Sequence, residues 1–187
     1  MNQAIAPDRQ SISKKHSKKP PVSYVYIENQ IKKKIYGILS TVSPSGRPQA
    51  AGVAYGVLVK PEKLTFYVMT GRDTVKVRNI QSNPNVVFTI PYPHYYLRMA
   101  PSFSIQASGT AQILDISDEK GEKSFQTTRL RRSMLNYVKK ALPEEDSVFI
   151  KITPRKELLC FGIGVHLLHM MRHREDGFYR MPFPVEE

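Results

Sequence analysis

The chain has 187 residues, of which 41% are hydrophobic and 24% charged, and its formal net charge is +12. This length suits one globular domain, or one domain with an arm. The longest uncharged and mostly apolar stretch, Pro48–Val59, is too short for a membrane-spanning helix, which needs about 20 residues. The single cysteine, Cys160, excludes a disulfide framework and a cysteine-based zinc site. Met1–Lys19 lacks the apolar segment of a secretory signal. We therefore expect a reduced, cytoplasmic protein.

The positive charge is concentrated near the N-terminus, where residues 1–34 hold eight Lys or Arg against two acids. Such a charge attracts nucleic acid, anionic lipid or small anionic ligands. Residues 1–22 are polar and end in Pro20-Pro21, which predicts a disordered basic arm followed by one domain over residues 23–187. The arm lacks the aromatics that alternate with cations in single-strand binding proteins. By itself it is typical of a solvated tail.

Runs of β-branched and aromatic residues, separated by turn signals, predict six strands. A short helix over 28–34 comes first, with Ile27 and Ile31 toward the core. The strands are expected over 35–42, 49–59, 64–69, 85–90, 103–114 and 148–152, with a further extended segment over 157–163. A loop rich in proline and aromatics separates the fourth and fifth strands, over residues 92–102. The tail from Gly164 has no clear period.

Two helical segments interrupt the strands. Asp73 or Thr74 can cap a short helix that ends at Ser82, with Val77 and Ile80 toward the core. Residues 118–142 are expected to be largely helical, up to Pro143. The predicted apolar face of this 118–142 helix holds Phe125, Met134, Tyr137, Val138 and Ala141. Its predicted solvated face holds Arg129, Arg131, Arg132, Lys139 and Lys140.

These elements predict a mainly β fold with a few flanking helices. Strands that follow one another by short turns favour an antiparallel meander. Six such strands can close into a split β-barrel, which removes the exposed edges of an open sheet.

The segment from Thr70 to Lys76 runs from a strand through a glycine turn into a helix start. Helix N-termini offer unpaired N–H groups and a partial positive charge to anions. Thr70 and Thr74 can donate hydrogen bonds, while Arg72 and Lys76 supply positive charge. These features indicate a phosphate site. A capped surface helix with scattered cations is the alternative interpretation.

The same segment resembles the FMN-binding split barrels related to pyridoxamine 5′-phosphate oxidase. The family pattern is a strand ending in Thr, then Ser/Thr-x-Lys, then a helix closing on Asn-Pro. Here it is matched by Thr70, Thr74-Val75-Lys76 and Asn83-Pro84. Gln49-Ala50-Ala51-Gly52 upstream and Gln106 to Ala111 downstream also fit, so the resemblance covers roughly residues 31–153.

The resemblance implies a six-stranded antiparallel split barrel that forms a homodimer with FMN at its interface. Thr70, Thr74 and Lys76 would bind the phosphate with help from Arg72, and Arg78 and Asn79 follow on the helix. Small residues on the second strand, Ala51 and Val53 among them, would let the flat ring approach the backbone. Gln106 and Ser108, which share a strand face with Ser104, would hydrogen-bond the ring edge.

The chain also departs from the oxidase pattern. Val75 stands where the family commonly has Arg, and Phe103-Ser104 replace an Arg-Gln pair. The chain has no tryptophan, and the oxidase's C-terminal substrate segment is missing. The vitamin substrate is therefore not supported.

Other candidate residues have simpler explanations. His166, His169 and His173 share a helical spacing and could ligate a metal or haem, with Glu175 and Asp176 near them, or belong to a basic tail at a dimer contact. We predict no metal site. Cys160 lies among apolar residues and is expected to be buried and inert, and His94 could lie over a bound ring.

The most specific hypothesis is an oxidoreductase that uses FMN for hydride transfer to or from a small molecule. One alternative is a deazaflavin-dependent reductase of the same fold. Others are a non-catalytic flavin- or haem-binding protein, and a nucleic-acid-binding barrel that uses the cations of Lys14–Lys34 and Arg129–Lys140. No membrane partner is expected. The substrate and the electron donor stay open.

Overall fold

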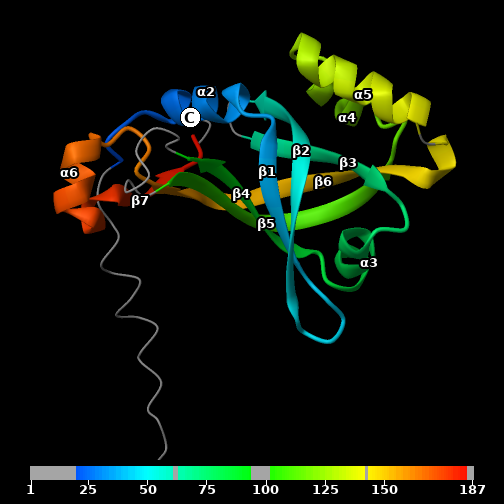
Figure 1. The fold of residues 1–187 in the computed structure, drawn as a ribbon, viewed down its shortest axis with the longest axis horizontal. Coiled ribbons are helices and arrows are strands. Elements are labelled where there is room, and N and C mark those ends of the chain that lie inside the picture. Colours follow the sequence, from blue (N-terminus) through cyan, green and yellow to red (C-terminus); the bar gives the residue numbers. More distant parts are fainter. Residues whose placement is uncertain (1–19, 61–62, 94–101, 142, 185–187) are drawn as a thin grey trace, which may run out of the picture.

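A computed structural model describes residues 20–60, 63–93, 102–141 and 143–184 (Figure 1). All but the last three residues of the predicted basic arm, and most of the predicted 92–102 loop with His94, lie outside the described residues.

Six antiparallel strands form a closed barrel (Figure 1). They are β1 (Tyr36–Val42), β2 (Pro48–Lys60), β3 (Lys63–Gly71), β4 (Asn85–Tyr92), β5 (Phe103–Asp115) and β6 (Ser147–Phe161). Their order is β3-β2-β1-β4-β5-β6, and β3 pairs with β6 to close the barrel. The predicted mainly β split barrel is confirmed.

Strand β6 is continuous where the sequence predicted two separate segments. Pro154 in its middle has no N–H to donate, and the ladder is irregular there. Gly109 of β5 pairs with Pro154, and the next regular pair is Ala107 with Leu158. Residues 155–157 of β6 therefore stand opposite the single residue Ser108. A Cβ on Gly109 would lie 2.2 Å from a backbone oxygen of β6, so glycine is required at this close approach. The bulge carries the strand past its proline.

A seventh strand follows in the tail, for which the sequence shows no clear period. Helix α6 (Leu167–Arg172) and the 3₁₀ turn η2 (Arg174–Gly177) lead into β7 (Phe178–Pro182), which pairs with the second half of β6. Tyr179 and Met181 of β7 are buried. Five residues are too few for their alternation to be distinguished from chance.

Helix α3 (Val75–Ser82) agrees with the prediction, whereas α2 (Tyr24–Lys33) begins four residues before the predicted 28–34 helix. Ser23 caps α2 by accepting a hydrogen bond from the N–H of Tyr26, and Ile27 and Ile31 are buried under it. Val77 and Ile80 of α3 are buried as predicted. Of the helices in the described residues, none is long and apolar enough to cross a membrane.

The predicted helix over 118–142 is two helices, α4 (Glu119–Phe125) and α5 (Arg129–Ala141). The carboxylate of Asp118 accepts a hydrogen bond from Gly121 N at 2.7 Å and so caps α4. Thr128 does the same for α5, because its hydroxyl accepts from Arg131 N at 3.2 Å. A second cap in the middle of the segment starts a second helix.

The predicted faces of this segment were wrong in part: Arg129, Arg132 and Lys140 are exposed and Phe125 is buried as predicted, but two residues are exchanged. Arg131, expected in solvent, is 1% exposed, whereas Tyr137, expected on the apolar face, is 73% exposed. Leu135 is the other buried side chain of α5. The helical period is real, but the break after α4 rotates α5 relative to the face that a single continuous helix would present.

The buried guanidinium of Arg131 joins α5 to α2 and β2. Its Nη2 donates to the carbonyl oxygens of Lys32 (3.1 Å) and Lys34 (2.7 Å), and its Nε donates to Tyr55 O (3.3 Å). The last carbonyls of a helix lack internal partners and carry partial negative charge, so a cation suits this position. Burial nevertheless lowers the pKa of Arg131.

Aromatic rings fill the barrel interior. The ring centroids of Tyr55 and Phe66 lie 5.7 Å apart, and those of Phe66 and Phe88 lie 4.8 Å apart. A smaller apolar cluster under α4 and α5 consists of Tyr67, Ile116, Phe125, Leu135 and Phe149. The barrel is thus a packed core, and its functional surfaces lie outside it.

Candidate functional site

The turn between β3 and α3 is built by Thr74. Its hydroxyl donates to Gly71 O at 3.0 Å and lies 3.5 Å from the hydroxyl of Thr70. Thr74 is the N-cap of α3, but it makes no side-chain hydrogen bond to the helix amides. The first amides of α3 therefore lack a side-chain cap, as a helix end that receives an anion requires.

Lys76 lines a pocket of about 470 Å³ beside this turn. Thr41, Gln49, Ala50, Ala51 and Val75 complete the lining. Burial lowers the pKa of the Lys76 amine, because the ammonium loses part of its hydration. A phosphate in this pocket would replace the lost water with a charge-assisted contact. Lys76 and Ala51, both predicted site residues, thus lie together.

Asn79 forms hydrogen bonds to two residues that line this pocket. Its side-chain nitrogen donates to Thr41 Oγ1 (2.9 Å) and to Gln49 Oε1 (2.7 Å), which ties α3 to β1 and β2. Asn79 is 2% exposed, so its side chain supports two residues of the pocket lining from within the protein. Thr41 and Gln49 were missed, although their pairing opposite each other in the β1–β2 hairpin places them on one face.

Arg72 lies outside the pocket lining. Its Nε donates to Glu145 O at 2.7 Å, and its Nη2 donates to the carboxylate of Asp115 at 3.2 Å. These bonds tie the β3 turn to the end of β5 and to the short η1 turn (Glu144–Asp146). Val53 also contributes no side chain to the pocket, because it is 7% exposed in the core.

Gln106 and Ser108 line a second pocket of about 680 Å³ at the bulge of β6. The other lining residues are Arg155, Lys156, Glu157, Leu159 and Arg180. The Arg155 guanidinium donates to Asn85 Oδ1 at 2.6 Å, and Arg180 pairs with Glu157. Lys76 and Ala51 therefore line one pocket, Gln106 and Ser108 line another, and Thr70, Arg72 and Thr74 lie outside both linings.

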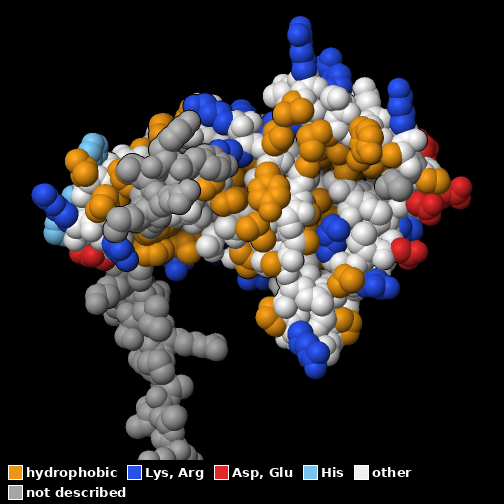
Figure 2. Space-filling view, in the orientation of Figure 1, with side chains coloured by type: hydrophobic (Ala, Val, Ile, Leu, Met, Phe, Trp, Pro, Cys, Tyr) orange, Lys and Arg blue, Asp and Glu red, His pale blue; other side chains and the backbone are white. Residues whose placement is uncertain are grey.

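The outer face of the sheet connects the two pockets. The strand registers place Ala50, Ser40, Val87 and Ser108 in one row, and Gly52, Ile38, Thr89 and Gln106 in the next. None of these eight side chains is charged, although a solvated face of an antiparallel sheet is normally polar. At about 4.8 Å per strand, Ala50 and Ser108 are roughly 14 Å apart. In Figure 2, hydrophobic side chains lie in the middle of the picture, at the place where Figure 1 shows β1 and β2.

The histidine cluster lies on α6 and the turn after it. The rings of His169 and His173 are 5.0 Å apart, and His169 Nε2 lies 2.9 Å from a carboxylate oxygen of Asp176. Within the described residues, no group of His, Cys, Asp and Glu side chains could hold a metal ion. Cys160 is buried as predicted, and burial raises the pKa of its thiol to about 12.

The family model described as pyridoxamine 5′-phosphate oxidase matches residues 26–160. The chain therefore belongs to the pyridoxamine 5′-phosphate oxidase family, and its barrel is the split barrel of that family. A search of curated proteins found no match.

Solved structures share this fold at low identity. The haem storage protein HutZ of Vibrio cholerae is 16% identical, with a TM-score of 0.59 over 74% of this chain and 94% of its own. A haem-binding protein of Mycobacterium smegmatis is 16% identical, with a TM-score of 0.53 over 69% of this chain and 49% of its own. General Stress Protein 26 of Bacillus anthracis is 24% identical, with a TM-score of 0.50 over 73% of this chain and 93% of its own.

Proposed function

We propose that this protein is an FMN-binding oxidoreductase that acts on a small molecule. The observation that carries the proposal is the partly buried Lys76 ammonium beside the helix end at Thr74, in the segment that matches the family. FMN supplies hydride transfer, and the chain binds and orients the cofactor.

The residues of the first pocket fit a phosphate monoester. Lys76 in the pocket lining would supply a charge, and the first turn of α3 would supply amides and the positive end of its dipole. The hydroxyls of Thr70 and Thr74 lie in the adjacent turn, outside the lining, and would have to reorient to donate to the phosphate. The pocket volume of about 470 Å³ is in the range of small-molecule sites. The small side chains at Ala50 and Gly52 leave room for a flat ring over β2.

We further propose that two copies of the chain share each cofactor. The two rows of uncharged residues between the pockets support this proposal, because the centre of a protein–protein interface is depleted of charged residues. A two-fold axis through this face would bring the Lys76 pocket of one copy opposite the Gln106 pocket of the other. This arrangement would place Gln106 and Ser108 of one copy near a cofactor held by Lys76 of its partner.

Haem is the second candidate ligand. Two of the structures that share the fold are described as haem proteins, and His169 and His173 lie close together on the surface. Imidazole nitrogen is a common axial ligand of haem iron. This candidate would use the tail, whereas the FMN site uses the barrel.

The absorbance spectrum of the purified protein tests both candidates. Flavin bands that reappear when FMN is added to stripped protein, and do not reappear with riboflavin, support the first proposal. A Soret band on adding haem, with no retention of FMN, would reject it. Reduction of a retained deazaflavin instead of FMN would assign the pocket to that coenzyme. Sedimentation equilibrium tests the shared site, and a monomer at all concentrations would exclude it.

A further inference from the structure

The structure brings two basic segments together that are far apart in the sequence. Arg131 of α5 donates to the carbonyls of Lys32 and Lys34, so the end of α2 lies against the start of α5. A hollow of about 550 Å³ between them is lined by Asn29, Lys32, Lys33, Ile35, Thr128 and Leu130. Lys32 and Lys33 of α2 thus share one surface with the start of α5.

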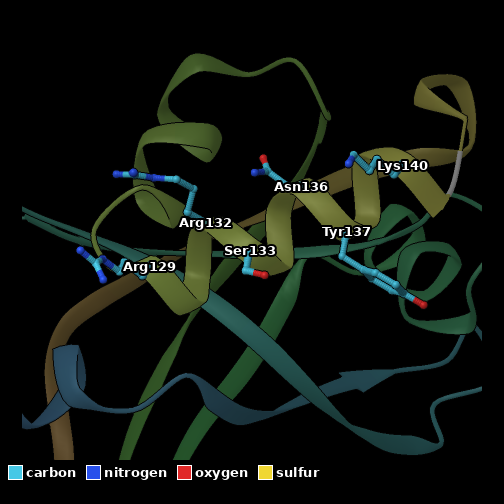
Figure 3. Close-up of a pocket in the computed structure, with 6 residues that line it drawn as sticks. All are labelled: Arg129, Arg132, Ser133, Asn136, Tyr137 and Lys140. Carbon is cyan, nitrogen blue, oxygen red and sulfur yellow. The ribbon is translucent and has the colours of Figure 1, made fainter.

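The outer side of α5 continues this surface as a shallow groove. It is lined by Arg129, Arg132, Ser133, Asn136, Tyr137 and Lys140, which Figure 3 shows along one side of the helix. Arg129 and Arg132 lie near one end, and Tyr137 and Lys140 near the other. From Arg129 to Lys140 the helix advances about 16 Å. Figure 2 shows Lys and Arg side chains projecting from the upper right, where Figure 1 places α5.

The charge of this surface is only partly neutralised. Helix α5 contains no acidic residue. Lys32 pairs with Glu28, and Lys139 pairs with Glu122. Within the described ranges of the chain, no carboxylate pairs with Arg129, Arg132 or Lys140. The partner that complements this surface is therefore anionic.

The side chains between the cations indicate which anion fits. Tyr137 is 73% exposed and supplies a flat ring on which a base can stack. Ser133 and Asn136 supply hydrogen-bonding groups in the same groove. A helix that lies on a membrane needs a wide apolar face. Leu135 of α5 is packed in the core, and Leu130, which is 55% exposed, is too little to make such a face.

We propose that this basic surface, made of Lys32, Lys33, Arg129, Arg132, Tyr137 and Lys140, binds single-stranded nucleic acid. The cations would contact successive phosphates, and Tyr137 would stack on an unpaired base. The surface shares no residue with the pockets of Lys76 or Gln106, so the proposed nucleic-acid site is separate from the proposed cofactor site.

The test is fluorescence anisotropy of a labelled 20-nucleotide oligothymidylate with the full chain, over a series of salt concentrations. The variant Arg129→Gln/Arg132→Gln/Lys140→Gln should bind about 10- to 100-fold more weakly, and its salt slope should fall by about 2. Tyr137→Ala should bind about 5- to 150-fold more weakly, whereas Tyr137→Phe should keep parental affinity because it keeps the ring.

A charge-matched variant controls for net charge. Arg47→Gln/Arg172→Gln/Arg174→Gln removes three exposed cations from elsewhere and should retain most of the affinity. Equal losses of oligothymidylate affinity in the two triple variants would overturn the proposal. Binding that disappears when residues 1–19 are deleted but survives the α5 substitutions would also overturn it. Tighter binding to a duplex than to the single strand, or binding only to phosphatidylserine vesicles, would overturn it as well. Circular dichroism of each variant confirms that the barrel is intact.

Discussion

Replacing Lys76 with alanine should weaken FMN binding without unfolding the barrel. The ammonium is partly buried in the pocket at the start of α3, where no other lining residue is charged. A hydrogen bond to a charged group contributes about 1.5–3 kcal/mol. Its loss corresponds to roughly 10- to 150-fold weaker binding. The fold should persist, because the core side of α3 consists of Val77 and Ile80.

The assay is a titration of FMN and riboflavin followed by flavin fluorescence. Lys76→Arg should lose less affinity than Lys76→Ala, because it keeps the charge but presents its donors differently. Arg78→Ala is the matched control, since Arg78 is an exposed cation on the same short helix. Riboflavin lacks the phosphate, so its weak binding should be nearly indifferent to the change at Lys76.

The pH dependence gives an independent check. Burial lowers the pKa of Lys76 in the free protein, and a bound phosphate would raise it by favouring the ammonium. FMN affinity should therefore decrease as the pH rises through the pKa of the free Lys76. Equal FMN affinities for the parent and Lys76→Ala, or equal losses in Lys76→Ala and Arg78→Ala, would refute the assignment of the phosphate to this pocket.

Three predictions concern the fold itself. Arg131→Met should lower the free energy of unfolding by about 2–4 kcal/mol in urea titrations, because it leaves buried carbonyls without donors, whereas exposed Arg132→Met should change it little. Gly109→Ala should lower the free energy of unfolding more than Gly46→Ala. Gly46 has φ +80° but open space around it, so its substitution should cost only about 1–2 kcal/mol. Similar losses of stability in the two variants would contradict the close approach of β6 to Gly109. The thiol of Cys160, with its pKa raised to about 12 by burial, should not react with a disulfide reagent at pH 8 until the chain unfolds. Stability should also fall as the pH rises above about 9, the ordinary pKa of a thiol, because only the unfolded thiol then ionises.

The candidate site shows how far sequence reasoning reached. The Thr74–Lys76 turn could be located because a helix start with hydroxyls and cations is a local feature. Lys76 and Ala51 do line one pocket. The partners of Arg72 could not be predicted from its neighbours in the sequence, because Asp115 and the carbonyl of Glu145 come from distant parts of the chain.

The order and kind of the barrel elements can be predicted from local sequence, because alternation, turn residues and helix caps act over a few residues. Features that depend on distant partners arise only when the chain folds. Arg131 is buried because the end of α2 presents carbonyls to it, and β6 runs through Pro154 because β5 offers a glycine opposite. The same dependence separates Lys76 from Gln106 in one chain. Local patterns specify elements, whereas burial, charge pairing and pockets arise where elements meet.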